Sequence, residues 1–217
     1  MSDMSIEVRG MDEALKSLPS VNTRRLLAAG AAEYKRLWRA RFDALDAAGN
    51  KKGFPPKNFW IKEGKLKTDV ADLTADMARV TCDSRAVAMR STGGTVRPRA
   101  AKALAIPLTP QAYAAGWPSN SGLPLEFVPV KSAKNPAVRG KLVEARATRI
   151  SYGRDGSVRK GRGNVKTAGT THYLLVSKSE IPPMGDAVMP ERTAAESAVT
   201  AKMGEALARE IERGSKK

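Results

Sequence analysis

The supply of large apolar side chains limits the size of the core that this chain can form. Hydrophobic residues make up 41% of the 217 residues, about 89, and 33 of these are alanine, which leaves about 56 stronger core formers. That number suits one medium-sized domain and is too small for a larger one. The composition therefore predicts a single domain over residues 1–217 that buries further surface against neighbouring subunits.

Three classes of protein are disfavoured by the same sequence. No apolar run approaches the ~20 residues of a membrane span, so no membrane partner is expected. The first residues have neither the basic nor the apolar segment of a signal peptide. Because Cys82 is the only cysteine, the chain forms no intrachain disulfide, which fits a reducing cytoplasm.

The net charge of +16 is concentrated in the middle of the sequence. Residues 48–110 carry 12 basic and 5 acidic side chains, and residues 111–170 carry 11 and 3. The two ends are balanced, with 8 and 7 in residues 1–47 and 7 and 7 in residues 171–217. A basic middle of this kind favours a polyanionic partner. A surface that serves only solubility is the alternative, but solubility does not require the segregation.

Two helices are predicted from apolar repeats. From Asn22 to Gly49, apolar residues recur at steps of three and four: Leu27, Ala31, Tyr34, Trp38, Phe42 and Leu45. This is an amphipathic helix with Asn22 or Ser20 as its N-cap. A second helix is predicted to begin at Pro190, with an apolar residue at every fourth position from Val199.

The intervening sequence predicts an antiparallel sheet. Residues 78–90 alternate around a break at Asp83–Ser84, which suits a hairpin. Further strands are predicted in 102–108, 125–130, 142–152 and 172–178. Long connections rich in glycine and basic residues, above all an arm over about 131–171, separate them. The expected fold class is α+β: an antiparallel sheet with a long N-terminal helix, a C-terminal helix and long basic arms.

Catalytic signatures are weak. His172 is the only histidine, and it lies in a strand-like run without a G-x-S-x-G motif, so a structural histidine is expected. Asp69, Asp72 and Asp76 have a spacing that could serve a divalent ion but is more typical of the polar side of a short helix. The sequence therefore predicts no enzyme, no cofactor and no metal site.

Three segments carry a resemblance to a known family: "FPPKNFW" (54–60), "GGTVRPRAAKALAIPLTPQAY" (93–113) and "YLLVSKSEIPPMGDAVMP" (173–190). Together with the N-terminal "SIEVRGMDEALKSL" and the long helix after it, they resemble the virion-morphogenesis and tail-completion proteins of tailed phages, in particular the Mu-like branch. None of these segments is a catalytic signature.

The resemblance implies a non-enzymatic virion protein at the neck or upper tail, assembled in the host cytoplasm. It implies a homo-oligomeric ring of six copies that contacts other neck and tail proteins, with genomic double-stranded DNA passing through it. Tail terminator, tail completion and head–tail joining all remain open.

The cations before the apolar run 104–108 and those of the arm are the expected contacts to DNA or to a partner: Arg97, Arg99, Lys102, Arg154, Arg159, Lys160, Arg162 and Lys166. Lysine and arginine on such segments neutralise phosphates without reading bases. A stand-alone, sequence-independent nucleic-acid-binding protein is the alternative function, although the usual nucleic-acid-binding motifs are absent from the sequence.

Overall fold

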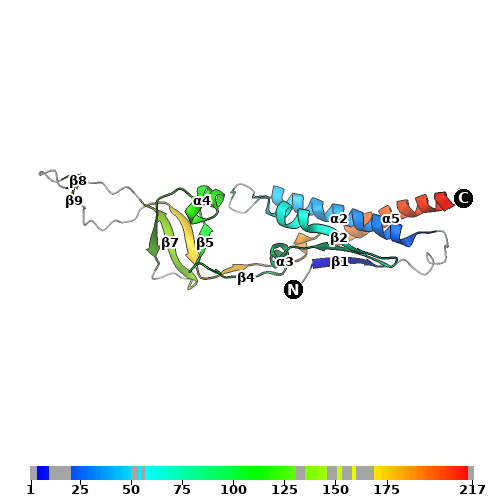
Figure 1. The fold of residues 1–217 in the computed structure, drawn as a ribbon, viewed down its shortest axis with the longest axis horizontal. Coiled ribbons are helices and arrows are strands. Elements are labelled where there is room, and N and C mark those ends of the chain that lie inside the picture. Colours follow the sequence, from blue (N-terminus) through cyan, green and yellow to red (C-terminus); the bar gives the residue numbers. More distant parts are fainter. Residues whose placement is uncertain are drawn as a thin grey trace. The chain divides into compact units, whose positions relative to one another are not determined.

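A computed structural model describes residues 4–9, 21–49, 53–54, 57–130, 135–145, 151–152, 158–159 and 169–214 (Figure 1). The chain forms two compact units. Unit 1 comprises Met1–Gly94 and Ile181–Lys217, and unit 2 comprises Thr95–Glu180. The expected α+β class, with a long N-terminal helix, a C-terminal helix and antiparallel sheets, is confirmed. A single domain over residues 1–217 stays a prediction.

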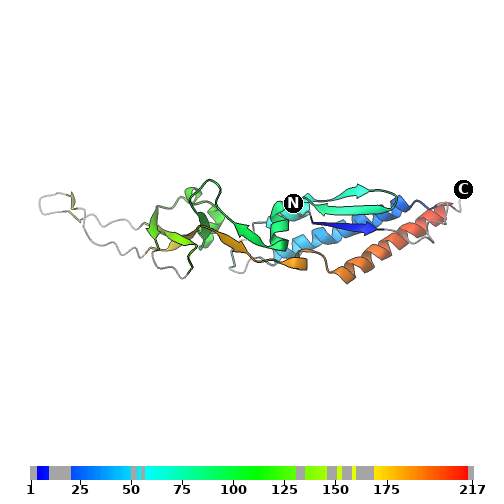
Figure 2. The same ribbon diagram turned by 90° about the horizontal axis from the view of Figure 1, so that it is seen from below.

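Unit 1 is built around the long helix α2 (Thr23–Ala47), which packs on one side against α5 (Arg192–Gly214). On its other side α2 contacts a three-stranded antiparallel sheet in the order β1 (Met4–Arg9), β3 (Met77–Cys82), β2 (Thr68–Leu73). Figure 2 shows these strands in front of α2, with α5 beside it. No helix in the described part of the chain is long and apolar enough to cross a membrane.

The apolar repeat of α2 forms the core of unit 1. Asn22 caps the helix, because its side chain accepts a hydrogen bond from the Arg25 backbone N–H at 3.2 Å. Trp38 and Phe42 are fully buried, and their rings stack with centroids 5.9 Å apart. The ring of Trp60 stacks on Phe42 at the same separation, so an aromatic row extends the core beyond the helix.

Trp60 begins a short helical segment in which η1 (Trp60–Gly64) has π geometry and η2 (Lys65–Lys67) is a 3-10 turn. Gly64 lies so close to Phe42 that a Cβ atom at this position would meet the ring at 2.8 Å. The two carboxylates Asp69 and Asp72 lie on strand β2, and Asp76 lies in the turn that follows. The short helix expected for these three residues was therefore wrong.

The predicted hairpin over 78–90 is half correct. Strand β3 forms, but the residues after Asp83 form helix α3 (Arg85–Thr92) instead of a second strand. Ser84 caps α3, since its hydroxyl accepts a hydrogen bond from the Val87 backbone N–H at 3.4 Å. The short 3-10 turn η4 (Gly185–Val188) packs against α3 and contributes the fully buried Val188 to the core.

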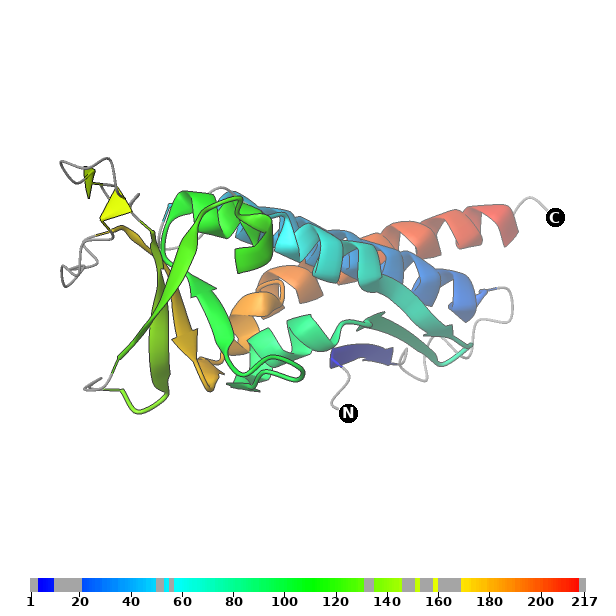
Figure 3. The ribbon, with the colours of Figure 1, turned by 60° about the vertical axis from the view of Figure 1, so that its left-hand side comes forward.

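Unit 2 contains a four-stranded antiparallel sheet in the order β5 (Leu104–Pro107), β10 (Thr171–Val176), β7 (Val138–Glu144), β6 (Leu125–Pro129). Helix α4 (Pro110–Ala115) contacts β5 and β10 (Figure 3). A 3-10 turn, η3 (Pro118–Asn120), follows α4. Strand β7 lies inside the range 131–171 of the expected basic arm and overlaps the strand expected at 142–152.

The chain passes between the two units at two paired strands. Strand β4 (Gly94–Val96) pairs with β11 (Ser179–Ile181). Gly93, which precedes β4, has a φ of 77°, and a Cβ atom there would meet the Ile181 carbonyl oxygen at 3.0 Å. Glycine is therefore required by both its backbone conformation and its close neighbour.

A buried carboxylate joins the beginning of α2 to the end of α5. Glu210 is 8% exposed, and its Oε1 lies 2.9 Å from Arg25 Nη1 and 3.0 Å from Arg213 Nη1. The hydrogen bond from Arg25, followed by the charges of both arginines, holds the pKa of Glu210 below its ordinary value. The pair links two segments that are 185 residues apart in the sequence.

We expect Glu210→Gln to destabilise unit 1 at neutral pH and to make its stability less sensitive to acid. A carboxylate with a lowered pKa stabilises the folded state above its unfolded pKa, and this contribution is lost as the pH falls below about 4.5. Urea unfolding at pH 7 and at pH 3.5 measures the difference. Glu196→Gln removes an exposed carboxylate from the same helix and is the matched control. Equal effects of the two variants at both pH values would contradict this assignment.

Candidate functional site

The three predicted cations Arg97, Arg99 and Lys102 lie in the irregular segment between β4 and β5, and all three are exposed. They belong to unit 2. None of them forms an ion pair or a side-chain hydrogen bond with the described residues. The strand that follows them pairs with β10, so the segment is tethered to the sheet at its C-terminal end.

The charge of the chain is divided unequally between the two units. Unit 2 holds 15 Lys and Arg against 4 Asp and Glu, a surplus of 11, whereas unit 1 holds 23 against 18, a surplus of 5. The structure also separates the two sets of cations by their partners. In unit 1 the described ion pairs include Arg25–Glu210, Lys35–Asp69, Arg36–Glu33, Lys65–Asp43, Lys67–Glu63, Arg79–Asp72, Arg192–Glu196 and Lys202–Glu205.

Among the described residues of unit 2, ion pairing is limited to Lys178–Glu180 and the contact of His172 with Glu144. The acidic residues of unit 2 are too few to neutralise its cations. A surface of this kind attracts a polyanion and loses that attraction as salt is added.

Two further cations of unit 2 were missed by the sequence reasoning. Arg139 and Lys141 lie on β7, where they are exposed and half-buried respectively, and neither has an ion-pair partner in the described part of the chain. A register shift between β10 and β7 falls at Arg139, because Leu175 pairs with Gly140 and Val176 pairs with Val138. The two cations within the strand-like run "VRGKLV" were the signal in the sequence that could have found them.

The five arm cations are mostly outside the described residues. Arg159 lies on β9 (Val158–Arg159), which pairs with β8 (Ser151–Tyr152). Arg154, Lys160, Arg162 and Lys166 fall in residues that the structure does not describe. The structure therefore places Arg97, Arg99 and Lys102 in one exposed segment, and the function of the arm residues stays a prediction.

The single histidine is buried in unit 2. A register shift in β10, between Thr171 and Tyr173, occurs at His172, which is 5% exposed. Its Nδ1 lies 2.9 Å from the hydroxyl of Thr109, the residue that caps α4. Neighbouring Tyr173 donates from its hydroxyl to the carbonyl of Ala112 in α4 at 3.1 Å. The irregular strand thus directs two consecutive side chains toward the same helix.

Thr109 joins His172 to the start of α4. Its hydroxyl oxygen accepts a hydrogen bond from the Ala112 backbone N–H, and the same hydroxyl is hydrogen-bonded to His172 Nδ1. His172 Nε2 lies 3.7 Å from Glu144 Oε2 and has no hydrogen-bond partner among the described residues. Thr109 caps α4, and His172 is hydrogen-bonded to Thr109. These contacts support a structural function for His172.

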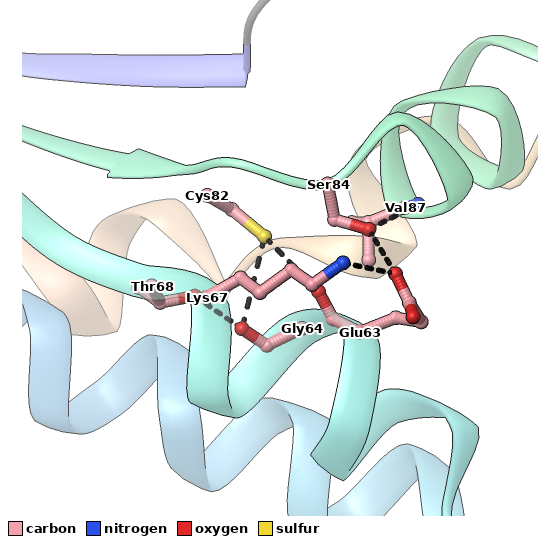
Figure 4. Close-up of polar contacts among 7 residues, drawn as sticks. All are labelled: Glu63, Gly64, Lys67, Thr68, Cys82, Ser84 and Val87. Atoms are coloured by element: carbon pink, nitrogen blue, oxygen red, sulfur yellow. Dashed lines mark hydrogen bonds and ion pairs between the residues drawn. The ribbon is translucent and has the colours of Figure 1, made fainter.

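A second polar network joins η1 and η2 to β3 and α3 (Figure 4). Glu63 accepts hydrogen bonds from Lys67 Nζ at 2.7 Å and from the Ser84 hydroxyl at 2.8 Å. These two bonds hold the pKa of the Glu63 carboxyl below its ordinary value. Cys82 Sγ lies 3.7 Å from the Gly64 carbonyl oxygen, and burial raises the pKa of its thiol. Burial and a raised pKa both lower the reactivity of a thiol.

Within the described residues, no group of three or more His, Cys, Asp or Glu side chains could hold a metal ion. Asp69 instead binds Lys35 at 2.7 Å, and Asp72 binds Arg79 at 3.2 Å. Comparisons of the chain with models of known protein families, with curated proteins and with solved structures each found no match.

Thr109→Val should destabilise unit 2 by about 1–3 kcal/mol, because it removes both the cap of α4 and the hydrogen-bond partner of buried His172. Urea unfolding followed by NMR measures this change. The readout is the indole N–H signal of Trp117, the only tryptophan of unit 2, which is resolved from the signals of Trp38 and Trp60.

Thr109→Ser keeps the hydroxyl and is the matched control for this substitution. It should retain most of the stability and leave the His172 ring signals unchanged. If the serine and valine variants lost the same stability, the hydroxyl would have no part in holding His172.

Proposed function

We propose that this chain is a non-enzymatic structural protein of a tailed bacteriophage, located at the neck or upper tail, where copies form a ring through which the genome passes. The observation that carries the nucleic-acid part of this proposal is the contrast between the units. Many cations of unit 1 are held by carboxylates, among them Lys35, Lys65 and Lys67. In contrast, Arg97, Arg99 and Lys102 of unit 2 are exposed and have no ion-pair partner among the described residues.

The phage assignment rests on the resemblance of three sequence segments, and their places in the fold support it. Residues 93–113 contain β4 and β5, and residues 173–190 contain β11 and most of β10. Strand β4 pairs with β11, and β5 pairs with β10. Two of the resembling segments, distant in the sequence, are thus joined by strand pairing. This is what we expect if the resemblance reflects a shared fold.

A ring that lets DNA pass must attract phosphates without holding particular bases. Exposed lysine and arginine side chains do this, because their attraction to phosphate is independent of sequence and is weakened by salt. Arg97, Arg99 and Lys102 of unit 2 meet this requirement, since no described carboxylate fixes them in place. Salt bridges to acidic protein surfaces would respond less to salt, because they depend on fixed geometry.

The test is a salt titration of duplex-DNA binding by wild type and by the triple variant Arg97→Gln, Arg99→Gln, Lys102→Gln. For B-form DNA each phosphate contact contributes about 0.9 to the slope of log affinity against log salt. We expect weak, sequence-independent binding by wild type. We expect a slope lower by about 3 in the variant if all three cations contact phosphate.

The matched control removes three cations from unit 1: Arg192→Gln, Lys202→Gln and Arg209→Gln. All three lie on α5 and are paired with carboxylates, and the change in net charge is the same. This control should bind DNA nearly as wild type does. Equal slopes for wild type and the unit 2 variant would remove these cations from the DNA interface. Tight binding by an isolated monomer at physiological salt would favour the stand-alone nucleic-acid-binding protein.

A further inference from the structure

The longest uncharged run of the sequence lies in the more basic of the two units. Residues 103–125 contain no Asp, Glu, Lys, Arg or His, although 28% of the chain is Asp, Glu, Lys or Arg, which corresponds to about six residues in a run of this length. All of these residues belong to unit 2, which carries a surplus of 11 positive charges. They form β5, α4, η3 and the loop that leads to β6.

This uncharged run presents apolar side chains to solvent. Trp117 is 69% exposed, and Leu108, which precedes α4, is 38% exposed. Between them, Pro110 and Ala114 of α4 are exposed and lie on one face of the helix, because they are four positions apart. We call the exposed residues of 108–120 the α4 surface. An exposed apolar surface with polar residues at its edge is typical of an interaction site.

The backbone that carries Trp117 is held by hydrogen bonds of its own. The Trp117 carbonyl oxygen accepts from the Asn120 N–H at 3.0 Å. The Pro118 carbonyl oxygen accepts from the N–H of Ser121 at 3.2 Å and from its hydroxyl at 2.7 Å. Helix α4 is tied to β10 by the two side-chain contacts described above. A side chain presented on an ordered backbone loses less conformational freedom on binding, which lowers the entropic cost of the contact.

The composition of the α4 surface fits a protein partner better than nucleic acid. The central part of a protein–protein interface is depleted in charged residues, and tryptophan is the residue most often found among its strongest contacts. A nucleic-acid strand that stacks on an indole also needs cations nearby for its phosphates. The sequence supplies none between Lys102 and Glu126.

We propose that the α4 surface binds unit 2 of a second copy of this chain. Two units that each carry a surplus of 11 positive charges repel one another wherever their cations approach. An acidic partner would gain most from a surface that contains cations, and the α4 surface has none. A basic partner is accommodated where charge is absent, and a second copy of unit 2 is a basic partner.

This inference rests on the proposed function in one respect, because it names a contact surface of the proposed ring. The two can nevertheless fail separately. If copies associate through the α4 surface into a closed dimer, the inference stands and the ring is contradicted. If copies form a ring through another surface, the ring stands and the inference is overturned.

The test is sedimentation velocity of the full chain without DNA, over a series of protein concentrations at low and at high salt. We expect wild type to associate more strongly as salt is added, because salt screens the repulsion between basic units and leaves apolar contacts intact. DNA binding has the opposite dependence on salt. Trp117→Ser should weaken the association about tenfold or more, and Trp117→Phe should keep part of it.

A second variant tests the absence of charge. Ala114→Lys places a cation in the α4 surface and should prevent association at low salt. Ala194→Lys adds the same charge at an exposed position of α5 in unit 1 and should have a much smaller effect. Leu66→Ser is the control for the loss of an apolar side chain, because Leu66 is 71% exposed in unit 1. Trp117 and Ala114 are both exposed, so neither substitution removes a core contact, and urea unfolding checks this.

Three results would overturn the proposal. One is a wild-type chain that stays monomeric at about millimolar concentration in high salt. Another is association in Trp117→Ser and Ala114→Lys that equals that of wild type, or an equal loss of association in the two unit 1 controls. The third is association that appears only after duplex DNA is added, which would assign the contact between copies to the nucleic acid.

Discussion

The burial of the apolar stripe of α2 is the constraint on which unit 1 depends. A 25-residue helix with Trp38 and Phe42 fully buried needs cover on two sides, and α5 and the three-stranded sheet supply it. The stacking of Trp60 on Phe42 then fixes the start of the η1 turn, which positions the polar network around Glu63. The same packing leaves the opposite stripe of α2 exposed to solvent.

The sequence could predict elements whose signals are local. The repeat from Leu27 to Leu45 and the cap at Asn22 were sufficient for α2, because a long amphipathic pattern with a capping side chain has few alternatives. Helix α3 was missed because "RAVAMR" fits both a two-residue and a 3.6-residue period, and the cap formed by Ser84 was interpreted as a hairpin break. Asp69 and Asp72 fit a helical spacing, but pairing with β3 placed them on an irregular strand. In each case tertiary contacts selected between two local patterns.

The candidate site was predictable only where its signals are local in the sequence. Exposure of Arg97, Arg99 and Lys102 follows from a run of cations beside Pro98 and glycines, with few acids near them in the sequence. The sequence could not show which cations lack an ion-pair partner, because the fold decides which charged groups meet. Lys35 contacts Asp69, which is 34 residues away, and Arg39 donates to the carbonyl of Thr68, which is 29 residues away. The contact between Thr109 and His172 spans 63 residues and was likewise invisible to motif reasoning. Charge segregation in the sequence predicted a polyanion contact in the middle of the chain, and the structure identified described cations there that lack an ion-pair partner.

The central claim is that the chain is a structural component of a phage neck or upper tail. Cryo-electron microscopy of assembled particles that contain this chain, combined with counting of its copies per particle, tests this claim most directly. The account predicts a closed ring of about six copies, in line with the symmetry of phage tails, near the junction of capsid and tail, with unit 2 lining the DNA channel. Absence of the chain from purified particles, or a single isolated copy away from the channel, would contradict it.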